Sequence, residues 1–384
     1  MNKNKKILYL ITEDWFFCSH FLERALAAKN LGYEIIVCSK ENKDKKKIED
    51  YGIKFQEVKF NRKNINPFYE FIVLIKIINI YRKFSPDIVH QIAIKPIIYG
   101  SIAARLNNIR SVLNAPVGMG YIFTSDSVKA KFLKPLIKFL LKNLLSTSTG
   151  AKNKKNKVVF ENKDDLNYFV NVGAVNYKNT FLVRGAGVNI DKNFVNYRKN
   201  NKVPVIALVG RMIKDKGIFE YVDAAKILKK NNIKAKFLLI GGVDNYYSSP
   251  ISLKVLKKWH HEKIVEWLGH VCNVDEILEK IDVLCLPSYR EGLPKALIEG
   301  AAKGLPIVTT NTVGCKDVVE DGKNGFLVPI KNSMELARAI SVLIKDENLR
   351  FEMGCESFKI ASSKFASSII IEQTMAIYDE LNFK

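Results

Sequence analysis

Short apolar runs alternate with longer amphipathic stretches along the whole chain. Residues 6–12 and 33–39 are apolar and rich in β-branched side chains, which is typical of buried strands. Between them, residues 20–31 have a helical pattern that ends at Gly32, a residue suited to closing a helix. A strand, a helix and a strand in close succession form a βαβ unit. The pattern therefore predicts the α/β class, with doubly wound parallel sheets.

The same alternation continues through the chain and predicts two domains, because 384 residues are too many for one ordinary core. Residues 189–202 are polar, rich in Lys and Asn, and lack periodicity, which favours a linker. We expect one domain over residues 1–188 and a second from residue 203, and we expect residues 13–19 to form a loop. Further strands are expected at 86–90, 111–114, 158–160, 181–183, 203–209, 237–240, 281–286 and 306–310, and helices at 70–83, 95–106 and 129–145.

The most informative stretch runs from Leu286 to Gly300. A buried strand ends there, a polar turn follows, and a helix begins with Pro294 expected at its first position. Glu291 lies in the turn, and Glu299 lies about one and a half turns inside the helix. Carboxylates at this place suit sugar or ribose hydroxyls, from which they accept hydrogen bonds. The simpler interpretation is a helix that carries one half-buried glutamate.

A second signature follows the first strand of the second domain. Residues 210–217 read Gly-Arg-Met-Ile-Lys-Asp-Lys-Gly, with Arg211 and Lys216 five residues apart at the end of a buried strand. Arginine offers a planar fork of donors and lysine a point charge, so the two together can neutralise a diphosphate. The alternative is an ordinary solvated basic turn.

These two signatures resemble the E-x7-E and G-R-x-x-x-x-K-G elements of retaining nucleotide-sugar glycosyltransferases of family four, also called glycosyl transferases group 1. Those proteins have the GT-B fold, in which two Rossmann-like domains face each other across a cleft. The relatives include bacterial enzymes that act on polyprenyl-diphosphate-linked saccharides. The resemblance is specific over residues 203–329 and looser over the first half.

The resemblance implies roles for particular residues and domains. Residues 1–188 would bind the acceptor, residues 203–365 would bind the nucleotide sugar, and a last helix at about 366–384 would pack back onto the first domain. The catalytic set would be Arg211 and Lys216, which stabilise the departing diphosphate, and Glu291, which orients the donor sugar. The donor-binding set would be Gly210, Arg211, Lys216, Val271 (whose backbone would hold the base), Glu291, Gly292, Leu293, Pro294 and Glu299 (which would hold the ribose).

Candidate residues on the acceptor side are less specific. The loop after the first strand opens at the carboxyl edge of the sheet, so His20 is expected to face the acceptor, with a helix cap as the alternative. Asn114 stands where many relatives place a histidine beside the sugar, which puts a histidine role there in doubt. Gly118 and Gly120 belong to an apolar loop similar to that of relatives that act on lipid-linked saccharides, or to a plain connector.

The net charge of the chain limits the classes of partner that it is expected to bind. The formal net charge is +22, and Lys greatly outnumbers Arg, which favours an anionic membrane or a polyphosphate over nucleic acid. Residues 129–145 carry lysines at spacings of three and four between apolar residues. Such a helix either lies in a membrane interface or is a core helix with a solvated lysine stripe.

Other features bear on location and cofactors. No apolar run reaches the ~18 residues that cross a bilayer, and the first apolar segment soon meets acidic residues, so we expect neither a span nor a signal peptide. Six scattered cysteines without a CxxC pair fit a reducing, cytoplasmic compartment. No His/Cys cluster or DxD pair is spaced as metal ligands, so we expect no cofactor and no metal.

Together these observations predict a retaining, metal-independent hexosyltransferase in cell-surface polysaccharide, lipopolysaccharide or glycan assembly. It would move a hexose or N-acetylhexosamine from a nucleotide-diphosphate sugar to a lipid-linked saccharide at the inner face of the cytoplasmic membrane, and the donor we expect is a UDP-sugar. One alternative is a sugar-nucleotide epimerase or hydrolase of the same fold. A second is a non-enzymatic basic protein that binds nucleic acid.

Overall fold

The computed structural model describes residues 5–61, 66–118, 128–145, 155–191, 201–244 and 249–382. Its contacts divide the chain into two compact units. The N-terminal unit comprises residues 1–186 and 368–384, and the C-terminal unit comprises residues 187–367. The chain therefore leaves the first unit, completes the second, and returns to the first for its last helix.

In the described residues of the N-terminal unit, seven parallel strands form one sheet in the order β3-β2-β1-β4-β5-β6-β7. Ile7 of β1 pairs with Ile35 on one side and with Ile88 on the other. The order of strands therefore reverses between β1 and β4. The strands are β1 (Lys6–Glu13), β2 (Glu34–Lys40), β3 (Lys54–Glu57), β4 (Ile88–Ile92), β5 (Ser111–Ala115), β6 (Lys155–Phe160) and β7 (Thr180–Leu182).

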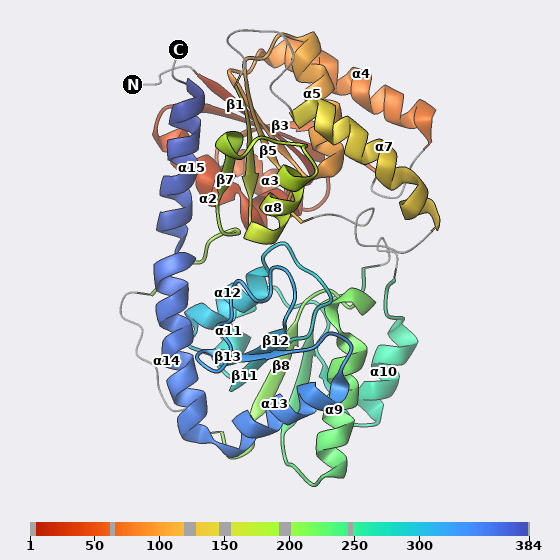
Figure 1. Ribbon diagram of the computed structural model, residues 1–384, viewed down its shortest axis with the longest axis vertical. Coiled ribbons are helices and arrows are strands. Elements are labelled where there is room, and N and C mark those ends of the chain that lie inside the picture. Colours follow the sequence, from red (N-terminus) through yellow and green to blue (C-terminus); the bar gives the residue numbers. More distant parts are fainter. Residues whose placement is uncertain are drawn as a thin grey trace. The chain divides into compact units, whose positions relative to one another are not determined.

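Helices cover both faces of this sheet (Figure 1). Alternate residues of β1 point to opposite faces: Leu8 and Leu10 join one buried cluster, whereas Ile7, Tyr9 and Ile11 join another. The first face carries α4 (Pro67–Phe84), α5 (Ile94–Leu106), α7 (Val128–Leu145) and α8 (Lys163–Asn171). The second carries α1 (Asp14–His20), α2 (Leu22–Asn30), α3 (Lys45–Asp50) and α15 (Ser367–Asn382). This arrangement confirms the doubly wound class.

The loop predicted at residues 13–19 was wrong. Strand β1 continues to Glu13, and α1 begins at Asp14. Phe17 stabilises α1 by packing into the core, where it is fully buried with its ring centroid 5.4 Å from that of Tyr9. The buried carboxylate of Asp14 accepts hydrogen bonds from the backbone N–H groups of Trp15 and Asn42, both at 2.6 Å. Packing of Phe17 in the core therefore decides the structure of this segment, although its first residues, Glu13 and Asp14, are polar.

The last helix is attached to the first sheet by a buried polar network. The hydroxyl of Tyr378 on α15 lies 2.7 Å from the hydroxyl of Tyr9 and 2.8 Å from Nδ1 of His90 on β4. Burial lowers the pKa of His90 to about 3, with a further contribution from the charge of Arg24, so the ring is neutral at neutral pH. One hydroxyl thus pairs two buried polar groups, whose exposure to hydrocarbon without a partner would be costly.

The Tyr378→Phe variant should lower the free energy of unfolding of the N-terminal unit by about 3 kcal/mol, because Tyr9 and His90 lose their shared partner. Chemical denaturation followed by near-ultraviolet circular dichroism measures this. Tyr177→Phe is the matched control, since Tyr177 is 68% exposed. An equal effect in both variants would show that the network contributes nothing particular.

In the described residues of the C-terminal unit, six parallel strands form a second sheet in the order β10-β9-β8-β11-β12-β13. These strands are β8 (Val205–Val209), β9 (Lys236–Ile240), β10 (Glu266–Trp267), β11 (Val283–Leu286), β12 (Ile307–Thr310) and β13 (Gly325–Val328). The α-helices are α9 (Ile218–Lys230), α10 (Leu253–His261), α11 (Asp275–Leu278), α12 (Lys295–Ala302), α13 (Ser333–Lys345) and α14 (Glu347–Lys364). Here the strand order reverses between β8 and β11.

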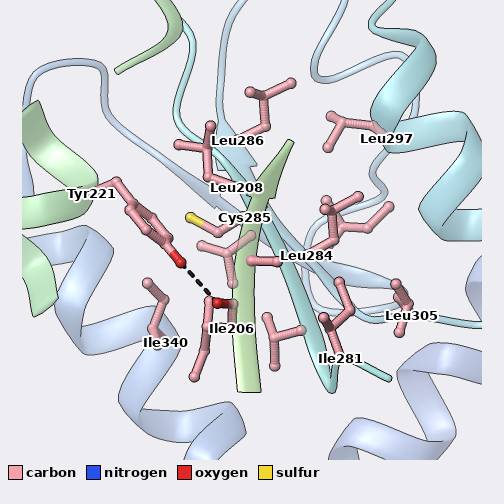
Figure 2. Packing of buried hydrophobic residues seen from close by; sticks show 14 of the residues in the cluster. Ile206, Leu208, Tyr221, Ile281, Leu284, Cys285, Leu286, Leu297, Leu305 and Ile340 are labelled. Atoms are coloured by element: carbon pink, nitrogen blue, oxygen red, sulfur yellow. Dashed lines mark hydrogen bonds between the residues drawn. The ribbon is translucent and has the colours of Figure 1, made fainter. Parts of the chain in front are cut away.

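The core of this unit is a continuous apolar cluster around β8 and β11 (Figure 2). Tyr221 of α9 is fully buried there, and its hydroxyl donates to the carbonyl oxygens of Ile206 at 2.9 Å and Leu238 at 3.1 Å. These bonds hold α9 against β8 and β9. The position of α9 in turn fixes the turn that precedes it.

Candidate active site

The predicted donor residues gather at the point where the second sheet reverses its strand order. Strands β8 and β11 are neighbours, with Ile206 paired to Val283. Residues 210–217 follow the carboxyl end of β8, and residues 287–294 follow the carboxyl end of β11. In open parallel sheets, ligands bind at this edge, where the two loops diverge. The topology thus brings together two motifs that lie about 80 residues apart in the sequence.

The two loops are in direct contact through an ion pair. The ammonium Nζ of Lys216 lies 2.5 Å from Oε1 of Glu291, and both side chains are largely buried, at 17% and 14% exposed. The backbone N–H of Tyr289 donates to the carbonyl oxygen of Asp215 at 2.9 Å. The hydroxyl of Tyr289 donates to Oε1 of Glu220, on the first turn of α9, at 2.7 Å. These contacts fix the positions of the Lys216 ammonium and the Glu291 carboxylate relative to each other at the crossover.

Glycine is required at the end of the first loop. Gly217 has φ of 70°, in the left-handed region, and a β-carbon there would lie 2.0 Å from the carbonyl oxygen of Pro287. The turn after β8 can therefore approach the end of β11 only without a side chain at this position. That approach is what allows Lys216 to reach Glu291.

The third neighbouring loop supports Glu291 from the other side. The backbone N–H of Glu291 donates to the carbonyl oxygen of Val313 at 3.1 Å. Gly314, with φ of 82°, packs so closely that a β-carbon would lie 2.7 Å from the carbonyl oxygen of Glu291 and 2.6 Å from that of Gly292. Leu293 is 7% exposed and joins the apolar core. The loop from Glu291 to Leu293 is therefore held on three sides.

Arg211 forms the second ion pair of the site. Its NH1 group lies 2.7 Å from Oδ2 of Asp244, and the Arg211 side chain is 40% exposed. Asp244 was not among the predicted residues. It comes just after the Gly241-Gly242 turn that ends β9, the strand next to β8, so its position at the same edge could have indicated it. Each cation of the predicted diphosphate site thus has a carboxylate partner.

Glu299 lies on α12, where Lys295 is 3.2 Å away. Burial raises the pKa of the Glu299 carboxyl above its ordinary value, and the ammonium of Lys295 opposes that rise. Pro294 is the N-cap residue of α12 and not its first helical residue as predicted, because the helix begins at Lys295. The helix still presents Glu299 on its second turn, after two buried residues, Leu297 and Ile298.

Gly210 and Val271 lie at the same edge of the sheet. The N–H of Gly210 donates to the carbonyl oxygen of Ile240 at 2.9 Å, which joins the ends of β8 and β9. Val271 follows β10 and is half-buried against the core. Gly269, two residues before Val271, is joined to the end of β9, because the backbone N–H of Gly241 donates to its carbonyl oxygen at 2.7 Å. The role of these backbones toward a base stays a prediction.

The predicted acceptor-side residues belong to the N-terminal unit: His20 is on α1, which follows β1, whereas Asn114 and Gly118 lie in and just after β5. His20 ends α1, with Nδ1 2.7 Å from the Ser19 hydroxyl and its ring 4.2 Å from that of Phe16. Asn114 on β5 is buried and donates to Asn156 at 2.7 Å. Gly118 is half-buried, with φ of 69°, whereas Gly120 lies outside the described residues.

Two further features belong to the part of the chain that the structure describes. No group of three or more His, Cys, Asp or Glu side chains there is arranged to hold a metal ion. None of the helices there is both long and apolar enough to pass through a membrane. The absence of a metal requirement stays a prediction.

Both halves of the chain match known families. Residues 189–359 match the family described as Glycosyl transferases group 1, and residues 6–147 match Glycosyl transferase 4-like. The chain belongs to the group 1 glycosyltransferases. The match to the first family covers every donor residue predicted above, from Gly210 to Glu299.

Two relatives match this glycosyltransferase over more than nine-tenths of its length. It is 26% identical, over 92% of its own length and 93% of the relative's, to N,N'-diacetylbacillosaminyl-diphospho-undecaprenol α-1,3-N-acetylgalactosaminyltransferase of Campylobacter jejuni. It is also 26% identical to the capsular polysaccharide biosynthesis glycosyltransferase CapM of Staphylococcus aureus, over 98% and 97% of the two chains. Its fold is similar to that of Anabaena Alr3699/HepE, solved in complex with UDP and glucose, with a TM-score of 0.75, 18% identity and coverage of 98% and 100%.

The Gly217→Ala variant should lose about 3 kcal/mol of stability in the C-terminal unit, because it adds a steric collision to an unfavourable backbone conformation. Gly322→Ala is the matched control. Gly322 has a similar φ of 74°, but nothing lies within 4 Å of its added β-carbon, so it should lose only about 1 kcal/mol. Thermal unfolding measures both, and equal losses would contradict a close contact with Pro287.

Proposed function

We propose that this glycosyltransferase moves a hexose or N-acetylhexosamine from a UDP-sugar to a polyprenyl-diphosphate-linked saccharide, with retention of the anomeric configuration. The observation that carries the proposal is the ion pair between Lys216 and Glu291 at the crossover of the second sheet, with Arg211 on the same loop as Lys216. The name of the Campylobacter relative, a diphospho-undecaprenol glycosyltransferase, supports the acceptor class. The complex of Alr3699/HepE with UDP and glucose supports the donor class.

The chemistry requires charge stabilisation on the leaving group. Breaking the bond between sugar and phosphate leaves negative charge on the diphosphate and positive character at the anomeric carbon. In this proposal Arg211 and Lys216 stabilise that diphosphate, since preorganised electrostatics is usually the largest catalytic contribution. A unit charge 4 Å away contributes about 4 kcal/mol at an effective dielectric of 20. The cations supply this charge directly, so we propose that transfer needs no metal ion and continues in EDTA.

The two carboxylates complete the site. Glu291, beside Lys216, orients the donor sugar by accepting hydrogen bonds from its hydroxyls, and Glu299 accepts from the ribose diol. The Lys216–Glu291 pair also means that a diphosphate meets an ammonium already held in place. The partner carboxylate limits the rotamer freedom that binding would otherwise have to remove.

Location belongs to the same proposal. We place the enzyme in the cytoplasm, in peripheral contact with the inner face of an anionic membrane, where a lipid-linked acceptor is available. Helix α7 supports this, because Leu141, Leu144 and Leu145 pack into the core while Leu136 and Phe139 are 53% and 64% exposed beside Lys142. The buried leucines fit the interpretation of a core helix, and contact of the exposed side with a membrane stays a proposal. The side chains of residues 129–132 lie outside the described ones.

Replacing Arg211, Lys216 or Glu299 by Ala should each weaken binding of a UDP-sugar by about tenfold to a hundredfold, since each loses a charge-assisted hydrogen bond worth 1.5–3 kcal/mol. Isothermal titration calorimetry measures the dissociation constant. Lys236→Ala is the control, because Lys236 pairs with Glu266 at 2.8 Å on the surface of the same unit. Unchanged affinity in all three variants would refute the site.

Product analysis separates transfer from the alternatives. The proposal predicts sugar transfer to a lipid-linked acceptor, with an anomeric coupling constant in the NMR spectrum that matches the donor. An epimerase or hydrolase would turn over the donor without an acceptor. A protein that binds nucleic acid would show steeply salt-dependent binding to any duplex and no thermal protection by UDP-sugar.

A further inference from the structure

Helix α4 is apolar on two opposite sides. Its inner side carries Val73, Ile77 and Tyr81, which are buried against the sheet. Its outer side carries a row that we call the α4 stripe, spaced so that its members lie on one face of the helix. The α4 stripe consists of Phe68, Phe71, Ile72 and Ile75, which are 74%, 58%, 51% and 41% exposed.

A solvent-facing stripe of a helix is ordinarily polar, and contiguous exposed apolar groups mark an interaction surface. Beside the α4 stripe lies a hollow of about 350 Å³ between α4 and the edge strand β3. Ile72 and Ile75 line it together with Lys76 and Lys83. Hydrocarbon next to ammonium groups is the chemistry that suits an anionic lipid.

Charge is distributed unequally between the two helical layers of the N-terminal unit. Helices α4, α5, α7 and α8 carry eleven Lys or Arg residues and three acidic residues, of which Glu70 is the one on α4, α5 and α7. The carboxylate of Glu70 accepts hydrogen bonds from Lys95 and from the hydroxyl of Tyr99, each at 2.6 Å. Helices α1, α2, α3 and α15 on the other face carry five Lys or Arg and seven acidic residues. The positive layer is thus the one with the exposed apolar stripe.

The outer faces of α4 and α7 point away from the same face of the sheet. Both helices pack against α5, and the three lie side by side in Figure 1. The exposed Leu136 and Phe139 of α7 therefore extend the apolar surface on the side of the α4 stripe. A second copy of this chain docking here would bring two strongly basic layers together, which opposes self-association.

We propose that the α4 stripe, with the outer face of α7, docks on the surface of a bilayer that contains anionic phospholipid. Phe68 and Phe71 insert among the lipid chains, and lysines of α4 and α7 contact the head groups. This inference rests on the proposed function, which requires an acceptor held in a membrane. It extends that function by assigning the main apolar contact to α4.

The direction of α4 relates docking to the acceptor. Helix α4 follows β3 and precedes β4, so its first turns lie at the carboxyl edge of the parallel sheet. The most exposed residue of the stripe, Phe68, is on the first turn. Docking through this end brings that sheet edge, which includes the ends of β1 and β5, toward the lipid surface.

A vesicle co-sedimentation experiment with the full chain tests the proposal. The double variant Phe71→Glu/Ile72→Glu is compared with Leu253→Glu/Met334→Glu, a control in the C-terminal unit with the same change in charge. The control residues are 53% and 65% exposed, close to the 58% and 51% of the test pair. Vesicles contain phosphatidylglycerol and phosphatidylcholine, or phosphatidylcholine alone. UDP-sugar affinity of each variant shows whether the donor site is intact, independently of membrane binding.

The wild-type chain and the control should bind the phosphatidylglycerol vesicles, and the test variant should bind on the order of tenfold more weakly with unchanged donor affinity. Binding of the wild type to phosphatidylcholine alone should be weaker than to the anionic vesicles. Equal vesicle binding by the test variant and the control would overturn the proposal. So would a wild-type dimer in sedimentation velocity that the test variant dissociates, since the stripe would then pair two copies. Failure of donor binding in the wild type would overturn the proposed function and leave the vesicle result to decide docking by itself.

Discussion

The ion pair between Lys216 and Glu291 is the contact on which the candidate site depends. It forms because β8 and β11 are neighbours at the crossover of the second sheet and because Gly217 lets the first loop approach Pro287. The pair satisfies a largely buried ammonium and carboxylate, either of which would be costly alone. The same two groups are those that a sugar diphosphate needs, one for its charge and one for its hydroxyls. The stability of these two loops and the proposed chemistry therefore both depend on the position of Lys216 beside Glu291.

Much of this arrangement could be predicted from the sequence. Apolar β-branched runs located most strands within a residue or two, and the spacing of Arg211, Lys216, Glu291 and Glu299 indicated the edge of the sheet that carries them. Asp244 was not predicted, because its ion pair with Arg211 depends on β8 and β9 being neighbours in the sheet. A single carboxylate after a Gly-Gly turn has no distinctive sequence pattern. Helix α1 was not predicted, because its stability comes from Phe17 packing on Tyr9. This tertiary contact cannot be read from the local sequence, in which Glu13 and Asp14 favour a loop.

The α4 stripe shows another limit of pattern reading. An apolar helix of this length reads as a core helix, and Glu70 to Lys83 was predicted only as such. Periodicity cannot tell which apolar face is covered when both are apolar. The fold resolves this, because Val73 and Tyr81 meet the sheet while Phe68 and Phe71 do not. The asymmetry of charge between the two helical layers likewise becomes visible only when each helix is assigned to a face.

The most direct test of the central claim is a crystal structure of the chain with a UDP-sugar bound. We predict diphosphate oxygens within hydrogen-bonding distance of Arg211 and Lys216, with the ribose hydroxyls on Glu299 and the sugar beside Glu291. A nucleotide sugar bound elsewhere in the molecule, with these four side chains making no contact to it, would contradict the account.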